Sequence, residues 1–212
     1  MEEEIVLVIG DKAWSSWSLR PWLALKVAGI PFEEVKIGLR RPDTAEQIAR
    51  HSPSGRVPVL KAGGLTVWDS LAICEYAAEF ALEPRLWPED ANARAAARSI
   101  AAEMHSGFHA LRKEFPMDYH ARIEGHVPSE QARADIMRVT QIWSDARRDY
   151  GAGGPFLFGT FTIADAMYAP VATRFQTYGI DLYAYGDDSG NAAAYAHAVL
   201  ALPEMAEWGA GA

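Results

Sequence analysis

The sequence predicts an α/β domain followed by an all-helical domain. Short strand and helix signals alternate up to about residue 80, whereas apolar residues at helical spacing dominate after about residue 90. The intervening stretch 81–90 contains Pro84 and Pro88 and has no hydrophobic period, so we interpret it as a linker. We therefore expect one domain over residues 1–82 and a second over residues 90–212.

The first half predicts the element order β-α-β-α-β-β-α. A β-branched run over 5–9 that ends at Gly10 is typical of a buried strand. The other expected elements, in chain order, are a helix over 18–28, a strand over 32–37, a short helix opening at 44–47, a hairpin of strands 57–60 and 65–68 around Gly63-Gly64, and a helix over 70–80 capped by Ser70.

The second half contains long apolar stripes that are typical of amphipathic helices. Residues 97–115 carry apolar side chains at intervals of three and four, which predicts one helix of about five turns. The same pattern over 132–150 predicts a second helix that ends at Gly151. A third helix is expected to begin at Thr162, and residues 192–202 predict a fourth.

Composition excludes several classes of protein. The 212 residues include 28 Asp and Glu against 20 Lys and Arg, a formal net charge of −8, which argues against a general nucleic-acid surface. The single cysteine, Cys74, permits no internal disulfide or Cys-based metal cluster, and we expect it in the core. His105 and His109 lie one turn apart but have no third ligand at a recognised spacing, so no metal is expected.

The start of the sequence carries no targeting signal that we recognise. Met1 is followed by three glutamates, the wrong sign for a secretory or transit peptide. The longest early apolar run, 5–9, is far too short to span a bilayer. We therefore expect a cytoplasmic protein without membrane association.

Two features of the first half point to a binding site for an extended, charged peptide. In Val57-Pro58, a proline opens a predicted strand and must lie at an edge, at a bulge or in a cis bond. A cis bond would leave the Val57 N–H and C=O free to pair with the ligand. Asp69-Ser70 lies where a strand meets a helix, so the helix N-terminus could bind a carboxylate and Asp69 an ammonium group.

A third feature is the run Ser15-Ser16-Trp17-Ser18, at the N-terminus of the first predicted helix. A hydroxyl at this place could donate a hydrogen bond to a bound thiolate, assisted by the helix dipole. Each of the three features also has a plain structural interpretation, as an edge proline or as ordinary helix capping.

Taken in this order, ahead of a helical domain, the three features resemble the cytosolic glutathione transferase superfamily over nearly the whole chain. The Ser-Ser-x-Ser-x-Arg pattern over 15–20 is similar to the serine-type classes, especially the zeta class. The resemblance implies a thioredoxin-like N-terminal domain that binds glutathione and a helical C-terminal domain that builds the acceptor pocket. In the second half, residues 159–165 resemble the superfamily's buried capping box, with Thr162 as N-cap and Asp165 at N3.

The resemblance also implies roles for individual residues. Ser15 matches the serine that activates the glutathione thiol, with Ser16 and Ser18 as alternatives. Val57 matches the backbone clamp on the cysteinyl unit, Pro58 the cis-proline, and Asp69 and Ser70 the γ-glutamyl site; Arg56 precedes the Val-Pro pair and is placed with these glutathione-binding residues. The chain departs from the zeta class at Trp17, where that class has Cys, and at Arg56 and Asp69, where it has Gln.

The implied function is conjugation of glutathione to small hydrophobic electrophiles, with no metal. The alternatives are glutathione-dependent isomerisation, dehalogenation or ether cleavage through a glutathionyl adduct, and a non-catalytic binding protein of the same fold. We expect His105, His109 and Arg112 near the acceptor pocket. Arg112 either attracts an acidic substrate or lies on a solvated face. Arg174 is expected in aromatic packing. The resemblance further implies a homodimer.

Overall fold

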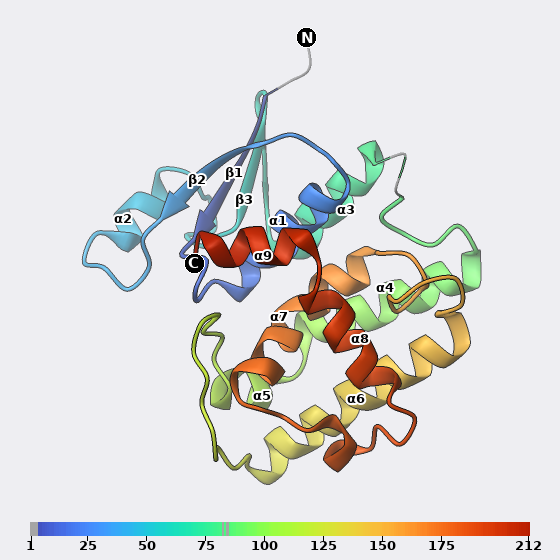
Figure 1. The fold of residues 1–212 in the computed structure, drawn as a ribbon. Helices are drawn as coiled ribbons and strands as arrows, with labels where there is room; N and C mark the ends of the chain where they lie inside the picture. Colours follow the sequence, from blue (N-terminus) through green and yellow to red (C-terminus); the bar gives the residue numbers. More distant parts are fainter. Residues whose placement is uncertain (1–3, 82, 84) are drawn as a thin grey trace.

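A computed structural model describes residues 4–81, 83 and 85–212, and it shows a small sheet with helices followed by a set of helices (Figure 1). This arrangement confirms the predicted fold class. Residues 1–3, the end of the first predicted domain at residue 82, and Pro84 of the predicted linker lie outside the described residues.

The first part has the predicted order of elements. They are β1 (Ile5–Gly10), α1 (Ser16–Val27), β2 (Glu33–Ile37), α2 (Thr44–Ala49), β3 (Val59–Ala62), β4 (Leu65–Trp68) and α3 (Ser70–Phe80). The strand order in the sheet is β2-β1-β3-β4, with β1 and β2 parallel and the other neighbours antiparallel. The hairpin between β3 and β4 turns at Gly63-Gly64, as the sequence predicts.

The sheet is covered on both faces because side chains alternate along β1. Leu7 and Ile9 belong to the main core, which also includes the apolar side chains of α1 and α3. Val8 instead packs with Ile48 of α2 and with Val59 in a smaller cluster. The predicted buried strand therefore contributes to two separate cores.

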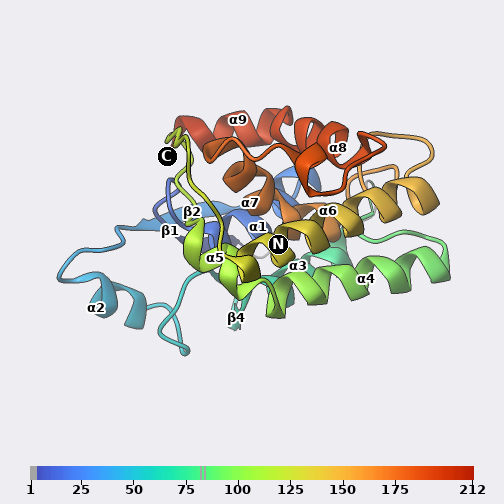
Figure 2. The same cartoon turned by 90° about the horizontal axis from the view of Figure 1, so that it is seen from below.

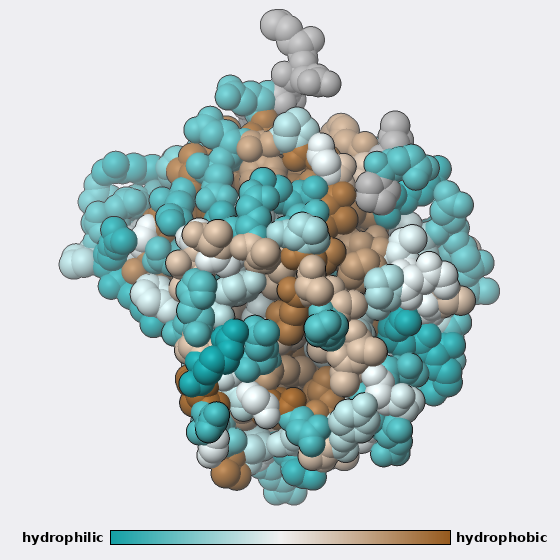
Figure 3. Space-filling view, in the orientation of Figure 1, coloured by the Kyte–Doolittle hydropathy of each residue, from teal (hydrophilic) through white to brown (hydrophobic). Residues whose placement is uncertain are grey.

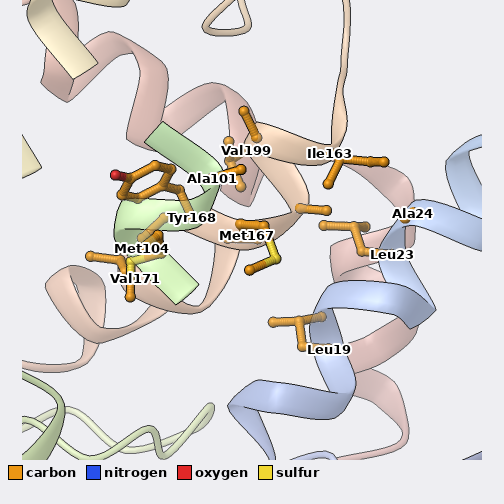
Figure 4. Packing of buried hydrophobic residues seen from close by; sticks show 14 of the residues in the cluster. Leu19, Leu23, Ala24, Ala101, Met104, Ile163, Met167, Tyr168, Val171 and Val199 are labelled. Atoms are coloured by element: carbon orange, nitrogen blue, oxygen red, sulfur yellow. The ribbon is translucent and has the colours of Figure 1, made fainter. Parts of the chain in front are cut away.

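The second part is helical in all its regular elements. They are α4 (Ala91–Ser106), α5 (His109–Glu114), α6 (Glu130–Tyr150), α7 (Ile163–Thr177), the 3₁₀ turn η1 (Leu182–Tyr185), α8 (Asn191–Leu200) and α9 (Pro203–Ala210). Helix α7 lies in the middle (Figures 1 and 2), and each of its residues except Gln176 is buried. Figure 4 shows Leu19 and Leu23 of α1 facing Met167 of α7, so one core continues from the first part into the second. Among the described residues, none of the helices is both long and apolar enough to cross a membrane.

The prediction of one helix over 97–115 is wrong, because the chain breaks between α4 and α5. Gly107 is extended, and Phe108 has a positive φ of 57°. The guanidinium of Arg112 donates to the carbonyl oxygens of Gly107 and His105, and the carboxylate of Asp135 accepts from the Leu111 N–H at 3.0 Å. Tertiary partners therefore replace the hydrogen bonds that a continuous helix would make.

The last helix, α9, is not predicted by the sequence pattern. Residues 192–202 were expected to form one helix, but α8 ends at Leu200 and α9 begins at Pro203. The ring of Trp208 meets that of Trp22 edge-on, with centroids 5.2 Å apart, and its Nε1–H donates to the Lys12 carbonyl at 2.8 Å. The chain's end thus covers α1.

On the same face, apolar side chains gather in a hollow surrounded by polar ones (Figure 3).

The capping box at the start of α7 is confirmed. The carboxylate of Asp165 is buried and accepts hydrogen bonds from the Leu157 N–H at 3.1 Å and from the Thr162 N–H at 2.7 Å. The Thr162 hydroxyl also donates to it at 2.9 Å. One side chain therefore fixes both the beginning of α7 and the loop before it.

We predict that Asp165→Ala lowers the free energy of unfolding by about 2–5 kcal/mol, because two buried N–H groups lose their acceptor. Asp90→Ala, which removes an exposed cap that accepts from the Ala93 N–H, should cost about 1 kcal/mol. Urea denaturation of both variants measures the difference. If Asp165→Ala costs no more than Asp90→Ala, the buried box does not have the role assigned to it.

Candidate functional site

A pocket of about 530 Å³ lies where the β4–α3 junction, the segment before β3 and the first turn of α1 meet α4. It is lined by Trp17, Ser54, Arg56, Val57, Pro58, Trp68, Asp69, Ser70 and His105. Five of the six predicted site residues are in this set, and Ser15 is not. Polar groups from separate segments thus converge on one pocket, which is the usual arrangement of a small-molecule site.

The Val57-Pro58 peptide bond is cis, one of the three conformations that the sequence left open. Pro58 is buried and Val57 is half-buried, so the backbone of this pair forms part of the pocket wall. Arg56 is exposed, and its backbone N–H donates to the Ser52 hydroxyl at 3.2 Å.

The junction between β4 and α3 places an acid and a hydroxyl side by side. Asp69 has a φ of 79°, and its Oδ1 accepts from the N–H groups of Leu71 at 2.9 Å and Ala72 at 3.3 Å. The prediction that Ser70 caps α3 is therefore wrong, because the carboxylate one residue earlier reaches the free N–H groups. The Ser70 hydroxyl instead accepts a long contact of 3.5 Å from Nη1 of Arg20.

The three serines at the start of α1 are all buried. Ser15 donates its hydroxyl hydrogen to Oγ of Ser18 at 2.7 Å, and Ser18 also accepts from the Gly10 N–H at 3.1 Å. The Ser16 hydroxyl accepts from Nη2 of Arg174 at 3.3 Å. Of this turn, only Trp17 lines the pocket, so Ser15 must rotate away from Ser18 before it can donate to a ligand.

Three guanidinium groups lie near the pocket: those of Arg20 and Arg112 contact the Trp17 ring, and that of Arg174 donates to Ser16. Burial, followed by the charges of Arg112 and Arg174, lowers the pKa of Arg20 to about 9, and burial together with Arg112 lowers the pKa of Arg174 to about 10. The guanidiniums of Arg20 and Arg112 lie 4.2 and 5.2 Å from the centre of the Trp17 ring. Among the described residues, no carboxylate forms an ion pair with any of the three. This side of the pocket is therefore positive.

His105 contacts both the acid and the aromatic wall. Its Nε2 lies 3.2 Å from Oδ2 of Asp69, and its ring meets Trp17 edge-on at 5.4 Å. Burial is the main reason that the pKa of His105 is lowered; Asp69 opposes this, and Arg20 and Arg112 add to it. The imidazole is thus neutral at neutral pH. His109 is exposed on α5, and in the described part of the chain no three His, Cys, Asp or Glu side chains form a candidate metal site.

Sequence reasoning assigned no role to several of these residues. Trp68 and Ser54 line the pocket, and their only signal is proximity to Asp69 and to the Val-Pro pair. Arg20 had a clearer signal, a charged residue within a strongly apolar stretch of a predicted helix. Cys74 is buried, as expected, and burial raises the pKa of its thiol.

The fold and this pocket define a two-part protein with a small-ligand site at the edge of its sheet, and comparison with known families identifies it. Residues 14–79 match the family described as "Glutathione S-transferase, N-terminal domain", and residues 93–208 match "Glutathione S-transferase, C-terminal domain". The chain belongs to the glutathione S-transferase family, as its resemblance predicts. It is therefore an enzyme of a family that uses glutathione.

Several relatives are named as isomerases. Maleylacetoacetate isomerase of Rattus norvegicus is 30% identical over 175 residues, 80% of this chain and 77% of that protein. Maleylpyruvate isomerase of Ralstonia sp is 27% identical over 81% of this chain and 83% of that protein. The structure of maleylacetoacetate isomerase from Anaeromyxobacter dehalogenans, with bound glutathione, aligns with a TM-score of 0.66 at 26% identity, over 97% of this chain and 95% of that one.

Proposed function

We propose that this protein is a glutathione-dependent isomerase of small unsaturated carboxylates. The observation that carries the proposal is the set of Arg20, Arg112 and Arg174, which lie near a pocket of glutathione-transferase type and form no ion pair with a carboxylate among the described residues. Buried cations need compensating charge, and an anionic acceptor supplies it. The names of the isomerase relatives support the same reaction class over conjugation, the other reaction expected from the sequence.

In this proposal the first domain, residues 1–82, binds glutathione and the second, residues 90–212, completes the acceptor site. The backbone of Val57, beside Pro58, pairs with the cysteinyl unit, and Arg56 offers a cation at the pocket rim. Asp69 binds the γ-glutamyl ammonium group, and Ser70 binds the adjacent carboxylate. The proposal also includes a cytoplasmic location, where glutathione keeps thiols reduced.

The reaction needs a thiolate at neutral pH. Lowering a thiol pKa from ~8.5 to ~6.5 requires roughly 2.7 kcal/mol. A charge-assisted hydrogen bond from Ser15 provides ~1.5–3 kcal/mol and the N-terminus of α1 ~0.3–1 kcal/mol. The thiolate then adds to one carbon of a cis double bond, the resulting single bond rotates, and elimination returns both the trans product and the thiolate. Glutathione is not consumed.

The test is an assay of the purified protein with glutathione and either maleylacetoacetate, maleylpyruvate or the neutral electrophile 1-chloro-2,4-dinitrobenzene. We expect catalytic cis–trans isomerisation of at least one carboxylate with no loss of free thiol. Conjugation of the neutral electrophile alone would replace this proposal with the transferase one. Retention on immobilised glutathione without any turnover would make the chain a binding protein.

Ser15 and Ser70 are expected to affect different kinetic constants. Ser15→Ala should lower kcat by one to three orders of magnitude, roughly the loss of one charge-assisted hydrogen bond, and raise the pKa of bound glutathione. Ser70→Ala should raise KM for glutathione and leave kcat nearly unchanged, because its contact is the same in ground and transition states. Full activity of Ser15→Ala, with loss in Ser16→Ala or Ser18→Ala, would reassign the activating hydroxyl.

A homodimer is part of the proposal. Large apolar side chains are exposed near the face expected to pair, namely Phe80 of α3 and Leu65 and Trp68 of β4. Helices α3 and α4 of two copies would meet across a two-fold axis. Light scattering at micromolar concentration should give twice the 23.3 kDa of one chain. A stable, active species of one chain mass would contradict the dimer.

A further inference from the structure

His105 is the one pocket-lining residue, among those described, that comes from the helical part of the chain. It lies in the last turn of α4, directly before the break at Gly107, and its ring turns toward the first part. There its Nε2 is 3.2 Å from Oδ2 of Asp69, while Oδ1 of the same carboxylate accepts the two N–H groups at the start of α3. The two oxygens of Asp69 therefore have different partners from different parts of the molecule.

The charge state of His105 follows from its surroundings. The groups that face it are Asp69 from the β4–α3 junction, Arg20 and the Trp17 ring from α1, and Arg112 from α5. Burial and the two arginines outweigh Asp69, so the imidazole is neutral at neutral pH and Nε2 carries the hydrogen that it donates to the carboxylate. A neutral donor orients Asp69 without cancelling its negative charge, which remains available to a ligand cation.

We propose that His105 is a positioning residue for recognition of the γ-glutamyl ammonium group: by donating from Nε2 to Oδ2 of Asp69, it fixes the carboxylate that binds this group. The inference rests on the proposed glutathione site. It adds that recognition of the ligand's amino group depends on a residue of α4. Asp69 is partly exposed, and the contact with His105 holds its side chain from a second direction, besides the two N–H groups of α3.

The experiment measures calorimetric affinities for two probes, S-methylglutathione and its analogue in which a glutaryl group without the amine replaces γ-glutamyl. His105→Ala should weaken S-methylglutathione binding about tenfold, the loss expected for a hydrogen bond to a charged group, and weaken the amine-free probe less than twofold. His105→Gln, whose amide can donate in place of Nε2, should restore most of the affinity. His109→Ala, an exposed histidine on the next helix, is the matched control and should change neither.

The pH profile gives a second readout that a purely structural role would not produce. As the pH falls below neutral and passes the lowered pKa of His105, the imidazole becomes cationic, pairs with Asp69 and competes with the ammonium group, so the wild-type affinity for S-methylglutathione should fall. His105→Gln should show a flat profile over this range, which also tests the inference if the alanine variant does not fold. Equal losses for both probes, or no loss, would overturn the inference. Failure of the wild-type protein to bind either probe would instead overturn the proposed glutathione site.

Discussion

Burial of α1 on nearly every side is the constraint on which the rest of the structure depends. The helix packs against α3 and the sheet, against α7, and through Trp22 against Trp208 of α9. Its first turn is fixed to the end of β1, because the Gly10 N–H donates to Ser18. A helix enclosed in this way holds the two parts of the chain in one core, and Trp17 of its first turn lines the pocket.

The same enclosure explains the unusual charge distribution. The chain has a net charge of −8, yet Arg20 and Arg174 are buried without a paired carboxylate in the described part of the molecule, while acids such as Glu103 pair with arginines at the surface. The positive charge near the pocket therefore results from where the acids are placed and not from a shortage of them. At an effective dielectric constant of 20, a positive charge about 7 Å from a thiolate stabilises it by roughly 2 kcal/mol. This is comparable to the roughly 2.7 kcal/mol needed to lower the thiol pKa from ~8.5 to ~6.5. A pocket built in this way favours both a thiolate and an anionic acceptor.

The sequence predicts those elements whose signals are local. The β-branched run before Gly10, the Gly63-Gly64 hairpin and the capping box at Thr162 and Asp165 each contain their own structural cause, and the structure has all three. The break at Gly107 has only the glycine as a local signal, and its geometry depends on the Arg112 guanidinium and on Asp135 from α6. Helix α9 likewise depends on a partner nearly 200 residues earlier in the chain, the Lys12 carbonyl that Trp208 contacts.

In the functional site, too, the sequence predicts the features with local signals and misses those that depend on distant residues. The residue pairs Val57-Pro58 and Asp69-Ser70 could be found because each is a local backbone feature, a cis bond and a strand-to-helix junction. The contact of His105 with Asp69 joins residues 36 positions apart in different parts of the chain, and no periodicity marks it. The orientation of Ser15 toward Ser18 is also invisible in the sequence, since three hydroxyls within four residues offer several equivalent pairings.

Trp17 stands where the resemblance to the zeta class implies a cysteine, and its indole lines the pocket. In a reaction through a glutathionyl adduct the nucleophile is the sulfur of glutathione, so residue 17 need not supply one. The indole forms a pocket wall whose other contacts are the guanidiniums of Arg20 and Arg112 and the edge of His105. An apolar ring between these charges and the pocket keeps water from that space, so their field is screened less than it would be through solvent. At this place the indole therefore transmits the field of the two guanidiniums to the pocket better than water would.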